Sequence, residues 1–423
     1  MNEQIKQRIA QLNNGEVPSG YEKTEFGIFP CDWVKDKTFG DLFDFYGGLG
    51  KSRDELGDEG HAYLHYGDLH RGAFNVVSHE QYEQLPKYDV ALKGTETYLM
   101  EDGDVAFLDA SEDLEGTSRA VLIDNPDNEP FIAGLHIIYG KSKEECLEKW
   151  YKQYITSSES VRKQFQRLAA GFKVYGVNRD TLPKIQVAYP KSTEEQSKIA
   201  EILMKWDEAI ELQEEFLHTL EIKRMAILQS FFSKEKCSNW IKLSDYVKEV
   251  SNRNNIGCQN VKSVSNKNGF IDQSSQFSKQ VASEDVSKYK VVTKDCVAYN
   301  PSRINVGSIA IYNEDTPGIV SPMYVVFKCV NMDPRFLLLL LETARGKYEV
   351  KSYLSGSVRD SLAFEDLKSI ELAVPPKEKW GEIVDILNII DAQYSLYNDK
   401  LSFLKRQRKA LQQYLLNGIV RVK

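Results

Sequence analysis

The chain of 423 residues is long enough for two or three domains, each with a hydrophobic core of its own. Hydrophobic residues make up 42% and charged residues 27%, which is typical of a globular protein and excludes a membrane or disordered chain. The net charge of −8 excludes a protein that wraps nucleic acid over its whole surface, but it allows DNA binding through local patches.

The N-terminal segment, residues 1–24, is charged and polar and lacks the apolar core of a signal peptide. The longest apolar run, Phe336–Leu341, is too short to span a bilayer, so we expect a cytoplasmic protein. The six cysteines form no CxxC pair, so free thiols are expected and a zinc ribbon is not. The histidines at 61, 65 and 70 cluster without a helical pattern or a cysteine partner, so we expect no metal there.

Residues 25–190 predict a mixed α/β globule with many short strands and Gly, Asn and Asp turns. Strand-like runs stand at 104–107, 120–123 and 135–139, and a helical stretch is expected at 143–168. The pattern does not predict the order of the strands in the sheet.

The run from Tyr46 to Ser52 imitates the end of a phosphate-binding loop. That motif needs a small residue five positions before Gly50, where Phe45 stands, so nucleotide binding is not expected. The turn could instead meet a DNA phosphate through backbone N–H groups and the charges of Lys51 and Arg53. A plain surface turn is the other interpretation.

Residues 191–236 predict a helix of about 40 residues, because apolar residues recur at alternating steps of four and three. The helix is expected to begin after Pro190, where Ser192-Thr193 with Glu195 and Gln196 offers a capping box. At 1.5 Å per residue it would be roughly 60 Å long.

Residues 237–375 repeat the landmarks of residues 25–190. Strand-like runs recur at 295–299, 309–312 and 323–327, and a helical stretch is expected at 334–353. The similar phrases Trp33-Val34-Lys35 and Trp240-Ile241-Lys242 open the two segments, and a proline closes each of them.

Residues 376–423 predict a second long helix, with Gly418 as its C-cap. Residues 194–232 align with residues 378–416 at a constant offset of 184, and eleven of thirty-nine positions are identical. The identical pairs are Glu194/Glu378, Ile199/Ile383, Ile202/Ile386, Leu203/Leu387, Asp207/Asp391, Leu212/Leu396, Leu217/Leu401, Leu220/Leu404, Arg224/Arg408, Ala226/Ala410 and Gln229/Gln413. The whole chain is therefore interpreted as two copies of one unit, a β-rich globule followed by a long helix.

The two apolar stripes are too long to stay exposed, so the simplest expectation is that they bury each other as a coiled-coil seam. Residues 191–235 hold six Lys/Arg and ten Asp/Glu, while residues 376–423 hold nine and five, so the charges are complementary. The predicted seam residues are Ile199, Leu203, Trp206, Ile210, Leu217, Leu220, Ile227, Phe231, Ile383, Leu387, Ile390, Tyr394, Leu401, Leu404, Leu411 and Leu415.

Arg224 and Arg408 occupy matching seam positions, where a charge is costly. In one interpretation their guanidinium groups extend to the edge of the seam. In the other they fix the register of the helices or contact a partner.

At this point the chain resembles, over essentially all its residues, the specificity (S) subunits of type I restriction–modification systems. The resemblance is carried by three phrases: Val17-Pro18-Ser19-Gly20-Tyr21 with Gly27–Pro30 and Trp33, Pro190 with Glu194–Ala200, Leu203 and Trp206-Asp207, and Tyr299–Ala310 with Ser321–Tyr324. The second helix departs from the family's opening, because Glu378-Lys379-Trp380 stands where the first helix has Glu194-Glu195-Gln196.

The resemblance implies an α+β fold in which two mixed α/β target-recognition domains are separated by two long antiparallel helices that form a coiled coil with a pseudo-twofold internal repeat. The expected parts are an N-terminal segment (1–24), the first target-recognition domain (25–190), the central helix (191–236), the second target-recognition domain (237–375) and the C-terminal helix (376–423).

The family also implies a function. Each domain would read one half of a bipartite, asymmetric duplex DNA site, and the helices would set the spacing between the halves. Two modification (methyltransferase) subunits would bind, one per half, and restriction/translocase subunits could join them. S-adenosylmethionine, ATP and magnesium are expected on those partners, with no cofactor in this chain.

The sequence itself offers no catalytic motif, so no catalytic residue is predicted. It has no glycine-rich methyltransferase loop and no nuclease cluster, and Asn300-Pro301-Ser302-Arg303 breaks the Asn-Pro-Pro-aromatic tetrad. An enzyme with an unrecognised site is the weakest alternative. A two-armed coiled-coil scaffold that joins proteins without reading DNA is the stronger one.

Arg and Asn pair well with guanine and adenine in the major groove, and basic side chains meet phosphates. The predicted DNA-binding residues are Lys51, Arg53, His70, Arg71, Arg119, Lys173, Tyr175 and Arg179 in the first domain, and Arg253, Asn254, Asn255, Lys262, Lys267, Arg303, Asn305 and Arg359 in the second. Residues 1–190 hold 21 Lys/Arg and 32 Asp/Glu, whereas residues 240–375 have a net charge of +2, so we expect weak DNA affinity for the isolated chain.

Overall fold

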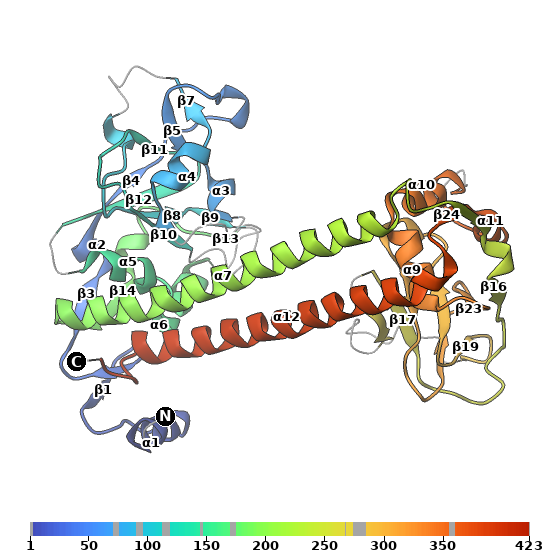
Figure 1. The fold of residues 1–423 in the computed structure, drawn as a ribbon. Coiled ribbons are helices and arrows are strands. Elements are labelled where there is room, and N and C mark those ends of the chain that lie inside the picture. Colours follow the sequence, from blue (N-terminus) through green and yellow to red (C-terminus); the bar gives the residue numbers. More distant parts are fainter. Residues whose placement is uncertain are drawn as a thin grey trace. The chain divides into compact units, whose positions relative to one another are not determined.

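The computed structural model describes residues 3–70, 76–89, 96–111, 119–143, 147–169, 175–266, 268–273, 285–354 and 360–422. The chain forms two compact units, which we call unit 1 (Met1–Leu212 and Leu401–Lys423) and unit 2 (Gln213–Lys400). Two long helices, α7 (Thr193–Phe231) and α12 (Trp380–Leu416), each supply one half to either unit (Figure 1).

Unit 1 is built on a five-stranded sheet with the order β4-β12-β8-β10-β6. Neighbouring strands are antiparallel except for β6, which runs parallel to β10. The strands are β4 (Phe43–Gly47), β6 (Val76–Val77), β8 (Val105–Leu108), β10 (Ala120–Ile123) and β12 (Ile137–Ser142). Nearly continuous apolar residues in β8 and β10 are buried on both faces, because a second layer covers the sheet.

That second layer is a three-stranded sheet with the order β11-β5-β7, and shorter strand pairs surround it. The remaining strands of unit 1 are β1 (Tyr21–Lys23), β2 (Ile28–Pro30), β3 (Trp33–Thr38), β5 (His61–Leu64), β7 (Lys87–Tyr88), β9 (Ala110–Ser111), β11 (Phe131–Ala133), β13 (Tyr175–Gly176) and β14 (Gln186–Pro190). Its shorter helices are α1 (Glu3–Asn13), α2 (Phe39–Leu42), α3 (Tyr66–His70), α4 (His79–Gln84), α5 (Lys149–Ile155) and α6 (Glu159–Ala169).

The largest core cluster of unit 1 lies between its central sheet, α5, α6 and the long helices. Phe107 from the sheet and Phe165 from α6 are buried there, together with Ile199 and Leu203 of α7 and Leu415 of α12. The ends of the long helices are therefore part of the globular core. This attaches the helix pair firmly to unit 1.

Unit 2 repeats the arrangement with a four-stranded antiparallel sheet in the order β16-β23-β20-β21. Its strands are β15 (Asn239–Lys242), β16 (Val247–Glu249), β17 (Lys262–Ser265), β18 (Gly269–Asp272), β19 (Lys290–Val292), β20 (Cys296–Tyr299), β21 (Ile309–Ile311), β22 (Gly318–Val320), β23 (Val325–Cys329) and β24 (Glu371–Val374). Its shorter helices are α9 (Pro334–Glu342), α10 (Ala344–Ser352) and α11 (Phe364–Ser369).

The core of unit 2 also takes in the long helices. Trp380, Ile383 and Leu387 of α12 and Leu228 of α7 are buried among the residues of the sheet and α9. The indole of Trp380 stacks on the ring of Phe336, with 4.5 Å between the ring centroids.

The predicted internal repeat is confirmed by the sheets, because β4-β12-β8-β10 and β16-β23-β20-β21 have the same order and directions. The strand-like runs of the sequence form β8, β10, β12, β20, β21 and β23. Each predicted shorter helical stretch is divided in two, into α5 and α6 and into α9 and α10. Thr343 divides the second stretch, because its side chain caps α10 by accepting a hydrogen bond from the Gly346 N–H.

The ends of the long helices differ slightly from the prediction. Ser192 Oγ accepts a 3.4 Å hydrogen bond from the Glu195 N–H, but the Glu195 carboxylate binds Arg421 and does not complete a capping box. Gly418 ends α12 with φ +66°, as expected of a C-cap glycine. Over the part of the chain that is described, no helix combines the length and the apolar character that crossing a membrane would require.

Candidate nucleic-acid interface and helix pair

The described loops after β4 and β8 and after β16 and β20 carry several of the predicted DNA-binding residues and leave one edge of each central sheet. In unit 1, β4 and β8 are both antiparallel to β12, so the loops after them lie at the same edge, which we call edge 1. In unit 2, β16 and β20 are both antiparallel to β23, and the loops after them form the corresponding edge 2.

The glycine-rich turn of edge 1 is held close to the protein by its own backbone. A Cβ on Gly48 would lie 1.9 Å from the carbonyl oxygen of Gly134, so only glycine fits there. The N–H groups of Gly48, Leu49 and Lys51 donate to Ile137 O, Ala133 O and the Tyr63 hydroxyl. These three donors already have acceptors within the protein, and DNA contact by this turn stays a prediction.

The two basic side chains of that turn are paired with carboxylates. Lys51 Nζ lies 2.9 Å from a carboxylate oxygen of Glu55. The pKa of Lys51 is raised, first by its hydrogen bond with the Tyr88 hydroxyl and then by the one with Glu55. The Lys51 hydrogen bond is also the main cause that lowers the pKa of Glu55 to about 2. Arg53 lies 2.8 Å from Asp68 at the start of α3.

Edge 1 contains a cluster that the sequence analysis did not find. His136 Nδ1 lies 2.9 Å from Asp109 Oδ1, and Tyr66 meets the His136 ring edge-on with 5.4 Å between the centroids. Beside them, burial and the nearby Arg53 lower the pKa of His65. These residues come from four separate segments, so only the folded sheet edge brings them together. His136 has a φ of +62°, which is uncommon for a residue other than glycine. This conformation marks the turn that presents the imidazole ring.

Four other predicted residues of the first domain are among the described residues. Arg119 is half-buried directly before β10. Arg179 is exposed. Its guanidinium group lies beside Gly47, because its central carbon would be 3.8 Å from a Cβ built on that glycine. Tyr175 is in β13, which pairs with β9 after β8, and His70 ends α3, but neither side chain is described. Arg71 and Lys173 are outside the described residues.

Edge 2 presents its polar side chains more openly. Arg253 and Asn255 follow β16 and are exposed. Arg303 and Asn305 are exposed on the turn after β20, which the buried Ile304 anchors between them. Within the described residues, Arg253 and Arg303 take part in no ion pair. Their DNA contacts stay a prediction.

Two predicted DNA-binding residues of the second domain have structural roles instead. Asn254 is 5% exposed, and its side chain bonds the Cys258 N–H and carbonyl and the Val286 carbonyl. Lys262 is 6% exposed and pairs with Asp272 and Glu314, which raise its pKa against the opposing effect of burial. The structure therefore argues against DNA contact by these two. Lys267 and Arg359 are outside the described residues.

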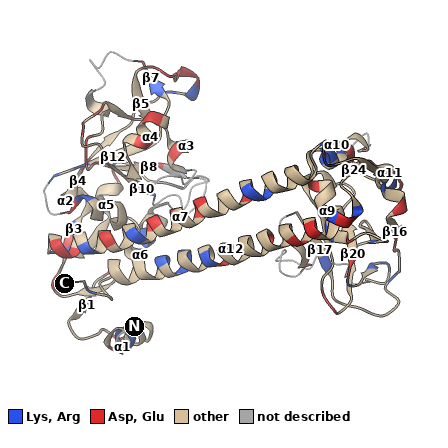
Figure 2. Ribbon diagram, in the orientation of Figure 1, with Lys and Arg blue, Asp and Glu red and all other residues tan. Residues whose placement is uncertain are grey.

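The long helices are joined in each unit by an arginine–aspartate pair. In unit 1, Arg408 of α12 donates hydrogen bonds of 2.8 and 2.9 Å to Asp207 of α7. In unit 2, Arg224 of α7 pairs with Asp391 of α12. The four residues are identical pairs of the repeat, so the two ion pairs are equivalent. Figure 2 shows that acidic and basic residues occur along both long helices. Of the two interpretations of these arginines, the ion pairs favour a device that fixes register.

Each ion pair is completed by a side chain from its own globule. In unit 1, the Tyr154 hydroxyl of α5 donates a 2.8 Å hydrogen bond to Asp207, and Arg408 also contacts Gln412. In unit 2, Glu342 of α9 supplies a second carboxylate to Arg224.

The helix halves run antiparallel within each unit. In unit 2, Tyr394 bonds Glu221 and Asp391 bonds Arg224, so residue numbers fall along α12 as they rise along α7. In unit 1, the contacts of Arg408 with Asp207 and of Arg421 with Glu195 show the same opposite direction. Every predicted seam residue is buried or half-buried.

No group of three or more His, Cys, Asp or Glu side chains suited to a metal occurs among the described residues. The five described cysteines are free, and Cys146 is outside the described residues.

A family model for the type I restriction modification DNA specificity domain matches residues 30–221 and 245–406. The fold is also similar to that of the type I restriction–modification system S subunit from M. genitalium, with a TM-score of 0.55 at 15% identity over 91% of this chain and 96% of that one. A chain from a study of complex assembly and conformational transition of the type I R-M system gives a TM-score of 0.52 at 15% identity, over 96% of this chain and 100% of that one.

Proposed function

The chain belongs to the type I restriction–modification DNA specificity domain family, and on that premise we propose that it reads a bipartite, asymmetric duplex DNA site for a modification complex. Recognition of DNA sequence is the function of this family. The bipartite site, the partners and the absence of catalysis in this chain are the parts that we add.

The observation that carries the proposal is the pair of equivalent sheet edges with different side chains. Edge 1 and edge 2 follow corresponding strands, but edge 1 presents the His136–Asp109 cluster and edge 2 presents Arg303 and Asn305. Two readers with one framework and different contact groups would recognise two different half-sites.

The repeated helices support docking of two copies of one partner. The same ion pair and the same seam recur in both units, so a subunit that recognises one copy would meet the second. We propose that these partners are modification (methyltransferase) subunits and that restriction/translocase subunits can join them. Their S-adenosylmethionine, ATP and magnesium would supply the chemistry, with this chain acting as a non-catalytic subunit.

Methylation sequencing of a host that expresses the chain with its methyltransferase subunit tests the proposal. We expect a split motif. Exchange of residues 25–190 for the matching segment of another specificity subunit should change one half of that motif and leave the other half unchanged. A complex that assembles without methylating any motif would instead favour a scaffold that joins proteins.

A further change concerns the unread spacer between the half-sites. Seven residues can be inserted into each long helix between its aspartate and its arginine, that is, between Asp207 and Arg224 in α7 and between Asp391 and Arg408 in α12. An insertion of one heptad keeps the apolar pattern in phase. If the helices set the spacing, the spacer should lengthen while the read bases stay the same. New read bases with the old spacer would contradict that role.

A further inference from the structure

We infer that a pocket in unit 1 between α7, α5 and the β6–α4 segment binds a lysine or arginine residue of a partner polypeptide. The cavity has a volume of about 520 Å³, which is within the size range of ligand sites in proteins. Its described lining residues come from α7, α5 and the β6–α4 segment, and none of them is a predicted DNA contact. DNA reading by the sheet edges does not need it.

The wall of the pocket on α7 is acidic. Glu201, Lys205 and Glu208 line it from consecutive turns of α7 and are exposed, and Glu211 lines it one turn further on. Lys205 is the one positively charged side chain among the described lining residues. Asp207 also lines the pocket, but Arg408 already compensates its charge. The two carboxylates of Glu201 and Glu208 against the one ammonium of Lys205 leave a net negative wall, which favours a cation and repels phosphate.

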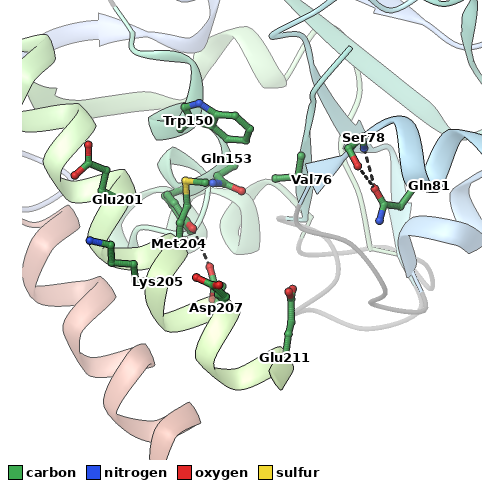
Figure 3. Close-up of a pocket in the computed structure, with 12 residues that line it drawn as sticks. Val76, Ser78, Gln81, Trp150, Gln153, Glu201, Met204, Lys205, Asp207 and Glu211 are labelled. Atoms are coloured by element: carbon green, nitrogen blue, oxygen red, sulfur yellow. Dashed lines mark hydrogen bonds between the residues drawn. The ribbon is translucent and has the colours of Figure 1, made fainter. Parts of the chain in front are cut away.

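Apolar side chains from α5, β6 and α7 also line the pocket, and methylene groups can pack against them. Figure 3 shows Trp150 and Met204 close to Gln153, with Val76 further along the same cavity. Lysine and arginine carry a chain of methylene groups below their charge, and such chains pack along apolar side chains while the charged end reaches carboxylates.

Gln153 is the observation that points to a polypeptide. Its side chain lines the pocket and is only 5% exposed, yet its amide nitrogen has no hydrogen-bond partner among the described residues (Figure 3). A buried donor without a partner is costly and rare, so a ligand that brings an acceptor would be stabilised there. A backbone carbonyl is such an acceptor. A free amine or polyamine brings the cation and the methylene groups but no carbonyl.

Two residues that line the pocket also take part in contacts of the helix pair. Tyr154 and Asp207 line it while bonding each other and Arg408, so they are held in place before any ligand arrives. An occupant would therefore lie beside the ion pair of unit 1.

Binding of N-acetyl-arginine methylamide to the full chain tests the inference. The protein is labelled with 5-fluorotryptophan, and Trp150→Phe assigns the Trp150 signal among the five tryptophans in the fluorine NMR spectrum. We expect a saturable shift of that signal. Propylguanidinium, which lacks the carbonyl, and N-acetyl-norleucine methylamide, which lacks the charge, should each bind about tenfold more weakly.

Two variants separate the charges from the amide. Glu201→Gln with Glu208→Gln, both on the exposed helix surface, should weaken binding of the arginine probe about tenfold and make it less sensitive to salt. Gln153→Leu should reduce affinity for the arginine probe to that for propylguanidinium, without lowering the Tm, because it removes an unpaired buried amide.

Three outcomes would overturn the inference. One is a Trp150 signal that moves with none of the probes. Another is equal affinity for propylguanidinium and the arginine probe, which would make the pocket a site for free cations. The third is a Gln153→Leu variant with a lowered Tm and unchanged probe affinity, which would give Gln153 a structural role only.

Discussion

Unit 1 and unit 2 share a framework but differ in how their sheet edges use charge. At edge 1, Lys51, Arg53 and His136 each face a carboxylate, whereas at edge 2, Arg253 and Arg303 are exposed and make no ion pair with the described residues. The parts that are the same, the sheet order and the Arg–Asp pairs, carry the packing. The parts that differ carry the contact groups.

The difference teaches that duplication fixed the scaffold and left the loops free to change. A charge in a helix seam is expensive unless it is paired, so the arginines and aspartates are retained together in both copies. A charged residue in an exposed loop at a sheet edge stays solvated, so it does not need a partner. The units should therefore respond alike to changes in the framework and differently to changes at the edges, and the exceptions to this are informative.

The largest expected effect distinguishes the two ion pairs. Asp207→Ala leaves Arg408 with the neutral Gln412 and the Tyr154 ring as its described neighbours and removes the acceptor of Tyr154, so we expect a loss of about 2–3 kcal/mol in the local stability of unit 1. In Asp391→Ala, Arg224 keeps Glu342, and the loss in unit 2 should be about 1 kcal/mol. Hydrogen–deuterium exchange of peptides from 401–416 and 380–400 measures each loss.

The exposed Gln229→Ala on α7 is the control and should change exchange little. Equal losses at both aspartates would mean that Glu342 and Tyr154 contribute nothing to the pairs, and that the two units do not differ at this place.

The next effect concerns the open edge. Arg303→Ala should weaken binding of the assembled complex to its motif duplex about tenfold or more, because a base contact contributes about 1–3 kcal/mol. Arg53→Ala should weaken it less than about threefold, because Arg53 is already held by Asp68. Fluorescence anisotropy at fixed salt measures both affinities.

Arg335 offers a matched control in unit 2. Arg335 is at the start of α9 and pairs with Asp333. Helix α9 follows the C-terminal end of β23, which lies at the edge of the sheet opposite edge 2. Arg335→Ala should leave affinity unchanged. A loss for Arg335→Ala as large as that for Arg303→Ala would reduce the role of edge 2 to general positive charge.

Much of this framework could be predicted, because its causes are local in the sequence. The seven-residue spacing gives the long helices, and apolar runs give the central strands. The ion pairs also left a signal, since Asp207 and Arg224 recur at the repeat offset as Asp391 and Arg408. Pairing of the retained acids with the retained bases could have been inferred from that.

The edges were harder to predict, because burial and partners there depend on distant segments. Lys262 looks like a DNA contact in sequence, but folding places it against Asp272 and Glu314. In the same way, nothing in the sequence shows that His136 meets Asp109. Polar composition marks the right edge of each sheet but not which side chains remain available there.

A third comparison uses pH, at the matching aspartates before β8 and β20. Asp104 is buried in unit 1, and burial raises its pKa to about 6, whereas Asp295 in unit 2 is exposed. Because the folded pKa exceeds the ordinary value of 3.8, protonation of Asp104 stabilises the fold at low pH. This contribution is lost as pH rises from about 4 to about 6.

Asp104→Asn should therefore gain stability relative to the parent over that range, reaching about 1–2 kcal/mol at pH 7. Urea unfolding at several pH values measures the difference, with Asp295→Asn at the exposed matching position as the control for loss of a surface carboxylate. If Asp104→Asn lost stability as pH rose, its carboxylate would have to be a stabilising charge in the folded state.

The smallest expected effect concerns the acidic residues of edge 1, which could lower its affinity for DNA by pairing with its basic residues. Glu55→Gln removes the carboxylate that pairs with Lys51 and so frees the ammonium for a phosphate. We expect non-specific DNA affinity of the assembled complex to rise about twofold to threefold at low salt and to return to the parent value at high salt. Glu83→Gln on α4 makes the same change of net charge at an exposed position. If both variants raised affinity equally, net charge alone would be responsible, and the pairing of basic residues at edge 1 would not restrain DNA binding.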